Sequence, residues 1–126
     1  MGNVTALRPH EVVRLDMEVI AVIYRNLGPA TAELMVARAL GELALAMAGI
    51  AAQVKTHQLS TMARQLTKLQ RMAENVGLDS LGKVAEDARV CLERADSTAF
   101  SAVWARLIRV AEKSLAREPG AVDLSV

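Results

Sequence analysis

Few residues in this chain of 126 could do chemistry. His10 and His57 carry imidazoles that could act as nucleophiles or ligands, but they lie far apart in the sequence and near the ends of predicted helices. Cys91 is the only cysteine, which excludes an internal disulfide and a multi-cysteine metal site, and its apolar helical neighbours are typical of an inert thiol. With no Gly-rich phosphate loop and no His-rich cluster, we expect no catalytic residue, no metal site and no cofactor.

The stretch ARQLTKLQRMAENVG, residues 63–77, holds the most informative group of polar side chains. Helical spacing places its threonine, Thr67, among three cations on the face opposite the apolar residues, and these are Arg64, Lys68 and Arg71. A threonine hydroxyl is not deprotonated near neutral pH unless a base stands beside it, and none is evident for Thr67. The stretch therefore predicts an exposed cationic face rather than a nucleophile, and by its pattern alone this face is either ordinary solvated surface or a binding surface.

The elements that must position these side chains are all predicted to be helices, because apolar residues recur at steps of three and four and no alternating strand pattern is found. Residues 9–27 are predicted to form an N-terminal helix, which Gly28 ends before Pro29 opens the next one. Further helices are predicted at residues 30–56, 59–76, 80–95 and 97–117. Their short connections favour an all-α, up-down antiparallel four-helix bundle. The chain is thus predicted to be a single domain with a flexible tail at residues 118–126.

Composition and charge restrict the function classes. Apolar residues make up 52% of the chain and the net charge is +1, so no overall field favours nucleic acid or an anionic membrane. The apolar run between Arg38 and Lys55 covers about 16 residues, fewer than the roughly 20 that a membrane span needs, and Glu42 interrupts it. No apolar signal region appears at the N-terminus. These features predict a cytoplasmic protein that binds neither nucleic acid nor membrane.

A family pattern runs through the third and fourth predicted helices. Its spacing is matched by Leu69, Ala73, Val76 and Gly77. The preceding QLSTMARQ and the following LDSLGKVAEDARVCLERAD, with its acidic end at Glu93 and Asp96, match as well. On these features the region 32–116 resembles the histidine phosphotransfer (HPt) domains of bacterial phosphorelays. Those domains are four-helix bundles, often preceded by a further helix, so the resemblance implies the same fold here.

The sequence departs from this family at the residues that carry out or assist the family's phosphotransfer. The phosphorylated histidine of the family corresponds to Thr67, its lysine to Gln70 and its glycine to Arg71. A threonine phosphoester would be too stable to pass its phosphate on, and Gln70 cannot neutralise a phosphate. Arg71 fills the room that the family's glycine leaves for an approaching receiver domain. The resemblance therefore implies a degenerate HPt-like protein that is not itself phosphorylated and is not an enzyme.

The resemblance also implies a partner. Receiver domains of response regulators present an acidic phosphorylation pocket, to which a cationic helix face is complementary. We therefore expect this protein to dock a receiver or kinase-type partner of a two-component system. The expected contact residues are Arg64, Thr67, Lys68, Gln70 and Arg71. Two alternatives remain open, namely a working phosphocarrier that uses His57 as a displaced nucleophile, and a purely structural helical dimer with no signalling role.

An excess of apolar residues in the first two predicted helices favours a homodimer. One bundle core covers about one stripe per helix, so the remaining apolar surface would be larger than monomers usually expose. The expected interface residues are Val13, Ile20, Ile23, Gly41 and Gly49. The competing outcome is that the first helix folds over the second within one chain and covers the surplus.

Overall fold

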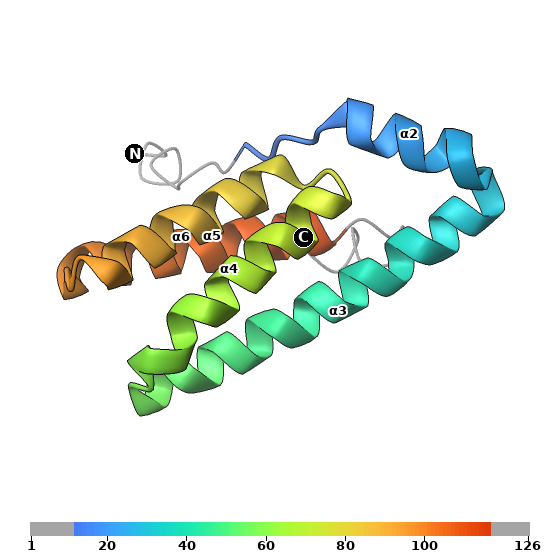
Figure 1. Ribbon diagram of the computed structural model, residues 1–126. Helices are drawn as coiled ribbons and strands as arrows, with labels where there is room; N and C mark the ends of the chain where they lie inside the picture. Colours follow the sequence, from blue (N-terminus) through green and yellow to red (C-terminus); the bar gives the residue numbers. More distant parts are fainter. Residues whose placement is uncertain (1–11, 117–126) are drawn as a thin grey trace, which may run out of the picture.

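The computed structural model describes residues 12–116, and every regular element among them is a helix (Figure 1). The helices are α2 (Met17–Leu27), α3 (Pro29–Thr56), α4 (Leu59–Asn75), α5 (Asp79–Glu93) and α6 (Ser97–Leu115). The predicted all-α class is thereby confirmed. Consecutive helices reverse direction, and α3, α4, α5 and α6 pack into what we call the helical body. The predicted tail at residues 118–126, residues 9–11 of the predicted first helix and His10 lie outside the described residues.

The N-terminal helix begins at Met17, so the prediction that it starts at residue 9 is wrong for residues 12–16. The helix begins directly after Asp16 because the Asp16 carboxylate accepts hydrogen bonds from the amides of Glu18 and Val19 and so caps α2. The non-helical segment before Asp16 is held by the turn between α4 and α5. The Asp16 amide donates to the Gly77 carbonyl over 2.7 Å, and the Arg14 amide donates to Ser80 Oγ over 2.6 Å.

The breaks between helices have local causes. Gly28 has φ +81°, and Pro29 is the first residue of α3. At this position a backbone N–H would have no partner within the helix, so proline, which lacks one, costs no hydrogen bond. The α3 helix ends at Thr56, and the next residue, His57, adopts the left-handed region with φ 57°. Gly77, with φ +77°, follows α4. Asp96 caps α6 by accepting from the Ala99 amide over 3.0 Å. These stops lie within a few residues of the predicted boundaries.

A single apolar core lies inside the helical body. The largest fully buried apolar side chains are those of Leu43, Ile50, Met62, Leu66, Leu69, Leu78, Leu81, Leu107, Val84 and Val110. They come from α3, α4, α5, α6 and the turn that follows α4, so each helix of the body buries one side. Leucines and valines at helical spacing can fill such a core without aromatic residues, of which the chain has few.

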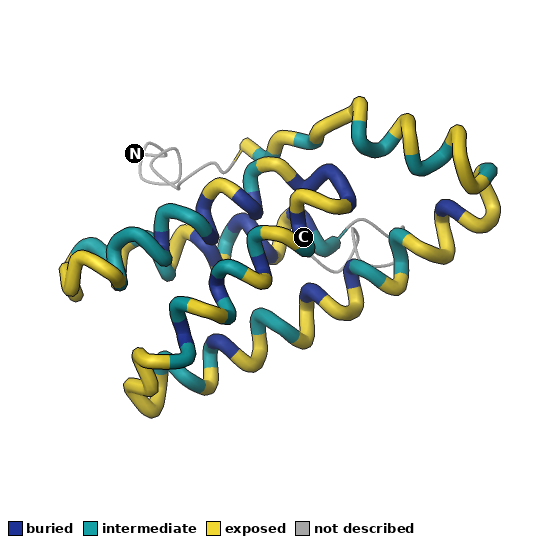
Figure 2. The backbone as a smooth tube through the Cα atoms, in the orientation of Figure 1, coloured by how far each residue is buried: buried dark blue, intermediate teal, exposed yellow. Residues whose placement is uncertain are grey.

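The α2–α3 part of the molecule is packed differently. None of the residues of α2 is buried, and α3 keeps exposed positions along its whole length (Figure 2). Among the described residues, α3 is the one helix long and apolar enough to cross a membrane by length and composition, and only 17% of its most apolar window is buried. The α2 helix contacts α3 but leaves Met17, Val22 and Leu27 exposed by 63%, 43% and 44%. The apolar surplus of these two helices is therefore not covered by residues 12–116.

Candidate docking surface and the His57 cavity

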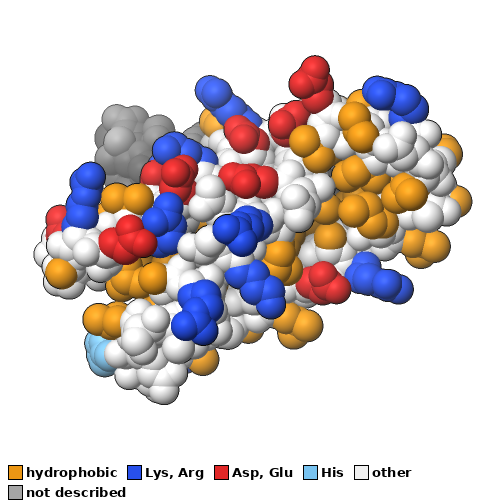
Figure 3. All heavy atoms as spheres, in the orientation of Figure 1, with side chains coloured by type: hydrophobic (Ala, Val, Ile, Leu, Met, Phe, Trp, Pro, Cys, Tyr) orange, Lys and Arg blue, Asp and Glu red, His pale blue; other side chains and the backbone are white. Residues whose placement is uncertain are grey.

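The predicted cationic surface lies on the outer face of α4. Residues three, four and seven positions apart share one side of a helix, so Arg64, Lys68 and Arg71 form one row, which we call the cationic row. All three are exposed, and Figure 3 shows Lys and Arg side chains following this helix. The row is fixed in place because the opposite face of α4 is fully packed. That face is formed by Met62, Leu66, Leu69 and Ala73, none more than 1% exposed.

Thr67 lies beside the cationic row and is half-buried. Its hydroxyl donates a hydrogen bond to the Ala63 carbonyl over 3.2 Å, the usual bond of a threonine inside a helix. A nucleophilic hydroxyl must give its proton to a base, whereas this one gives it to its own backbone. In the described part of the chain no imidazole or carboxylate is hydrogen-bonded to it. The geometry at Thr67 suits a contact residue better than a phosphate acceptor.

Gln70 lies at the edge of this surface that faces α5. Its amide Nε2 donates to Glu74 Oε2 over 3.0 Å, so a carboxylate lies beside the row. The two helices approach closely here, since a Cβ atom built on Gly82 of α5 would lie 3.1 Å from Glu74 Cγ and 3.5 Å from the Gln70 carbonyl. The sequence pattern did not single out Glu74, although its position four residues after Gln70 is the spacing at which helical side chains pair.

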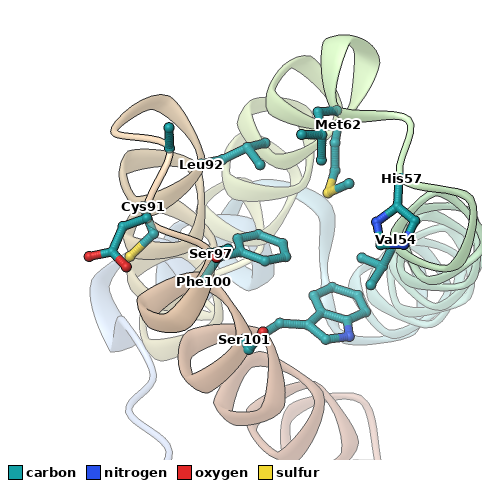
Figure 4. A pocket seen from close by; sticks show the side chains of 12 residues that line it. Val54, His57, Met62, Cys91, Leu92, Ser97, Phe100 and Ser101 are labelled. Carbon is teal, nitrogen blue, oxygen red and sulfur yellow. The ribbon is translucent and has the colours of Figure 1, made fainter.

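His57 belongs to a different part of the molecule. It lies at the C-terminal end of α3, and Thr67 follows it by nearly three turns, about 12–15 Å along α4. The imidazole lies at the rim of a cavity of about 380 Å³ at one end of the helical body (Figure 4). No hydrogen bond joins this imidazole to a carboxylate within residues 12–116. A phosphocarrier based on His57 would therefore work at a site separate from the Thr67 surface.

The walls of this cavity are mainly apolar. They include Val54, Met62, Leu92 and the rings of Phe100 and Trp104, which stack with their centroids 6.4 Å apart. Figure 4 shows Cys91 and His57 on opposite sides of the opening, so they do not form a thiol–imidazole pair. The cavity is the open end of the core and could take an apolar group. Sequence reasoning did not identify it, although Phe100 and Trp104, four residues apart, are two of the chain's three aromatic residues.

The residues predicted for a dimer interface separate into two groups. Ile20 is used within the chain, because a Cβ atom at Gly77 would lie 2.9 Å from its Cγ1 atom, and Val13 and Ile23 are also half-buried. The glycines, in contrast, are exposed. A Cβ atom at Gly41 would meet nothing within 4 Å, and one at Gly49 would meet only Gln65 Oε1, at 3.9 Å.

Comparisons with protein-family models, with curated proteins and with solved structures found no match to this chain. Within the described residues no three His, Cys, Asp or Glu side chains are grouped as metal ligands would be.

Proposed function

We propose that this protein is an HPt-like binding module of a bacterial two-component system, working in the cytoplasm, which docks a receiver or kinase-type partner without carrying phosphate. In this interpretation α3 to α6 are an up-down four-helix bundle of the HPt type and α2 is the additional N-terminal helix. The observation that carries the proposal is the cationic row of Arg64, Lys68 and Arg71 around Thr67 on a rigidly packed helix.

Charge and rigidity support this proposal. Exposed cations on one face attract an acidic partner and raise the rate of encounter, and the attraction weakens when salt screens it. The packed face of α4 fixes the backbone from which the row projects, so little backbone order has to be gained on binding. Arg71 projects from the surface one turn beyond Thr67, where it can reach a carboxylate of the partner.

The missing nucleophile supports the second half of the proposal. A phosphorelay needs an imidazole at the docking surface, and this surface has a threonine whose proton is bonded to the Ala63 carbonyl. Gln70 is engaged with Glu74, and the Glu74 carboxylate would repel an incoming phosphoryl group. Both features favour docking without transfer.

Docking is tested by binding a set of purified receiver domains to the triple variant Arg64→Glu, Lys68→Glu, Arg71→Glu. We expect the dissociation constant to rise by roughly tenfold or more, since each reversed charge now faces the partner's acidic pocket. The matched control is Arg25→Glu, Lys55→Glu, Arg94→Glu, which changes the net charge equally at exposed positions outside the row. Equal loss in both variants would show that only net charge matters and would contradict the proposal.

Transfer is tested by incubating the protein with a phosphorylated receiver domain and measuring acid-labile label. We expect none. Stoichiometric label that disappears in the His57→Ala variant would instead assign the displaced-nucleophile function to His57.

A further inference from the structure

The face of α3 that points away from the helical body is apolar and exposed, apart from the half-buried Ala37. Helical spacing places six residues in one row on this face, opposite the buried Leu43 and Ile50. These six, which we call the outward row, are Ala30, Leu34, Ala37, Gly41, Ala44 and Ala48. Leu34 is 73% exposed, and Leu45, beside the row, is 75% exposed. Monomeric proteins rarely leave a contiguous apolar face of this length in water.

No helix of the described chain covers this face. The α3 helix contacts α2, α4 and α6, its buried residues Ala32, Leu40, Leu43 and Ile50 lie outside the outward row, and α3 forms one edge of the molecule (Figure 1). Space is open at the centre of the row, where a Cβ atom at Gly41 would meet no atom within 4 Å. Hydrophobic side chains gather over α2 and α3 in the space-filling view (Figure 3). Residues 12–116 therefore leave this face open to a partner.

The spacing of the outward row indicates what that partner is. Its members recur at alternating steps of four and three, the repeat by which one helix presents a seam to another helix. When the row is paired with its own antiparallel copy, Leu34 lies opposite the partner's Ala44, and Ala37 lies opposite the partner's Gly41. Large side chains then meet small ones, and the two backbones come closest where both residues are smallest.

The charges beside the row fit the same arrangement. Arg38 and Glu42 flank one side of the row, and neither takes part in an ion pair within the described residues. A two-fold axis between Ala37 and Gly41 brings Arg38 of each copy within reach of the partner's Glu42, on the same side of the seam. Such an interface is self-complementary, as a two-fold contact must be. A bilayer would have to accommodate both charges in its hydrocarbon region, even if they paired with each other along α3, which is costly.

We propose that two copies of this chain pair antiparallel through the outward row of α3, with the two-fold axis between Ala37 and Gly41. The cationic row lies on α4 rather than on α3, so the dimer can form whether or not that row docks a partner. The pairing accounts for the exposure of Leu34 and Leu45, for the open space at Gly41 and for the unpaired charges of Arg38 and Glu42.

The pairing is tested by analytical ultracentrifugation at micromolar concentration. We expect a mass of about twice 13.5 kDa for the unaltered chain. The double variant Leu34→Glu, Leu45→Glu should sediment as a monomer with unchanged helix content, because both positions are exposed within one chain. The control is Leu59→Glu on α4, where the leucine is 53% exposed and lies outside the row, and it should remain dimeric.

A charge exchange tests the register. Arg38→Glu should raise the dissociation constant of the dimer by roughly tenfold, and adding Glu42→Arg to the same chain should restore it. A mass of 13.5 kDa for the unaltered chain, or no recovery in the exchanged variant, would overturn the proposal. Binding of a monomeric chain to phosphatidylcholine–phosphatidylglycerol vesicles, abolished by Leu34→Glu, would assign the face to a membrane and overturn it as well.

Discussion

The two parts of this molecule use apolar side chains in opposite ways. In α4 and α5 the apolar residues form one stripe per helix, and Leu66, Leu69 and Leu81 on those stripes have no exposed surface. In α2 no residue is buried, and α3 exposes Leu34 and Leu45 by 73% and 75% while it buries Leu43 completely. A helix with one apolar stripe is satisfied by one layer of neighbours, whereas a helix that is apolar all round needs neighbours on two sides. The difference shows that the described residues cover one side of α3 and leave its other side exposed.

The largest test of this comparison uses Leu43 and Leu45, which lie two positions apart on α3. Leu43→Ala removes a side chain with 0% exposure, and we expect it to lower the free energy of unfolding by about 2–5 kcal/mol through lost burial and the resulting cavity. Leu45→Ala, at 75% exposure, should change it by about 0.5 kcal/mol or less. Urea unfolding at submicromolar concentration, where a dimer would dissociate, measures both. Similar losses for the two variants would contradict the division of α3 into a buried and an outward face.

A second pair of substitutions compares glycines in the two parts. Gly77→Ala places a Cβ atom 2.9 Å from the Asp16 carbonyl oxygen and from Ile20 Cγ1, at a residue with φ +77°. We expect a loss of about 1–3 kcal/mol in the free energy of unfolding from backbone strain and overlap. Gly41→Ala meets open space within a helix and should instead stabilise the monomer by up to about 1 kcal/mol, the difference in helix propensity. Chemical denaturation checks both signs, and destabilisation by Gly41→Ala would show contacts that the structure lacks.

The two helix caps sharpen the comparison further. Asp96 caps α6 of the helical body, so Asp96→Ala should reduce the free energy of global unfolding by about 1 kcal/mol. Asp16 caps α2, which buries no residue, so Asp16→Ala should instead speed hydrogen exchange of the α2 amides and leave global unfolding almost unchanged. Asparagine retains the capping oxygen and serves as the control at both positions. Equal effects on global unfolding would show that α2 unfolds together with the body.

The smallest expected effect concerns the exposed charges of α5. The hydrogen bond from Lys83 to Asp87, followed by the charges of Asp87 and Glu86, raises the pKa of Lys83 above its ordinary 10.5. A raised pKa in the folded state means that this stabilisation is present at neutral pH and is lost as the pH rises through the folded-state value, above 10.5. Lys83→Met should therefore lower the thermal midpoint slightly at pH 9. At a pH well above the folded-state pKa of Lys83, the substitution should leave the midpoint unchanged. Because the pair is exposed, the change should be smaller than those above, and Lys68→Met, on the cationic row, is the control.

The apolar stripe of the third predicted helix shows how much of the site could be predicted from the sequence. The period of three and four placed seven residues on one side, namely Leu59, Met62, Ala63, Leu66, Leu69, Ala73 and Val76. The structure buries five of them, but it leaves Ala63 half-buried and Leu59, in the first turn of the helix, 53% exposed. The positions of Arg64, Lys68 and Arg71 on the opposite side follow from the same period, and all three are exposed. The Gln70–Glu74 hydrogen bond joins residues four positions apart on α4, a spacing that the period allows but that the sequence analysis did not single out. The cavity beside His57 depends on where α5 and α6 lie, and helical period carries no information about that.

What the sequence by itself determined is the set of helices and their ends, because period, glycine, proline and capping residues act over a few neighbouring positions. Gly28 and Pro29 break the chain for reasons that any sequence window shows. The start of α2 was decided by tertiary structure, since the apolar residues of the segment before Asp16 suit a helix, and it is Gly77 and Ser80 that hold that segment out of one. Tertiary structure also decided which face of α3 is covered. Leu43 and Leu45 are equally apolar, and only the placement of the helices that pack on one side of α3 makes one a core residue and leaves the other in water.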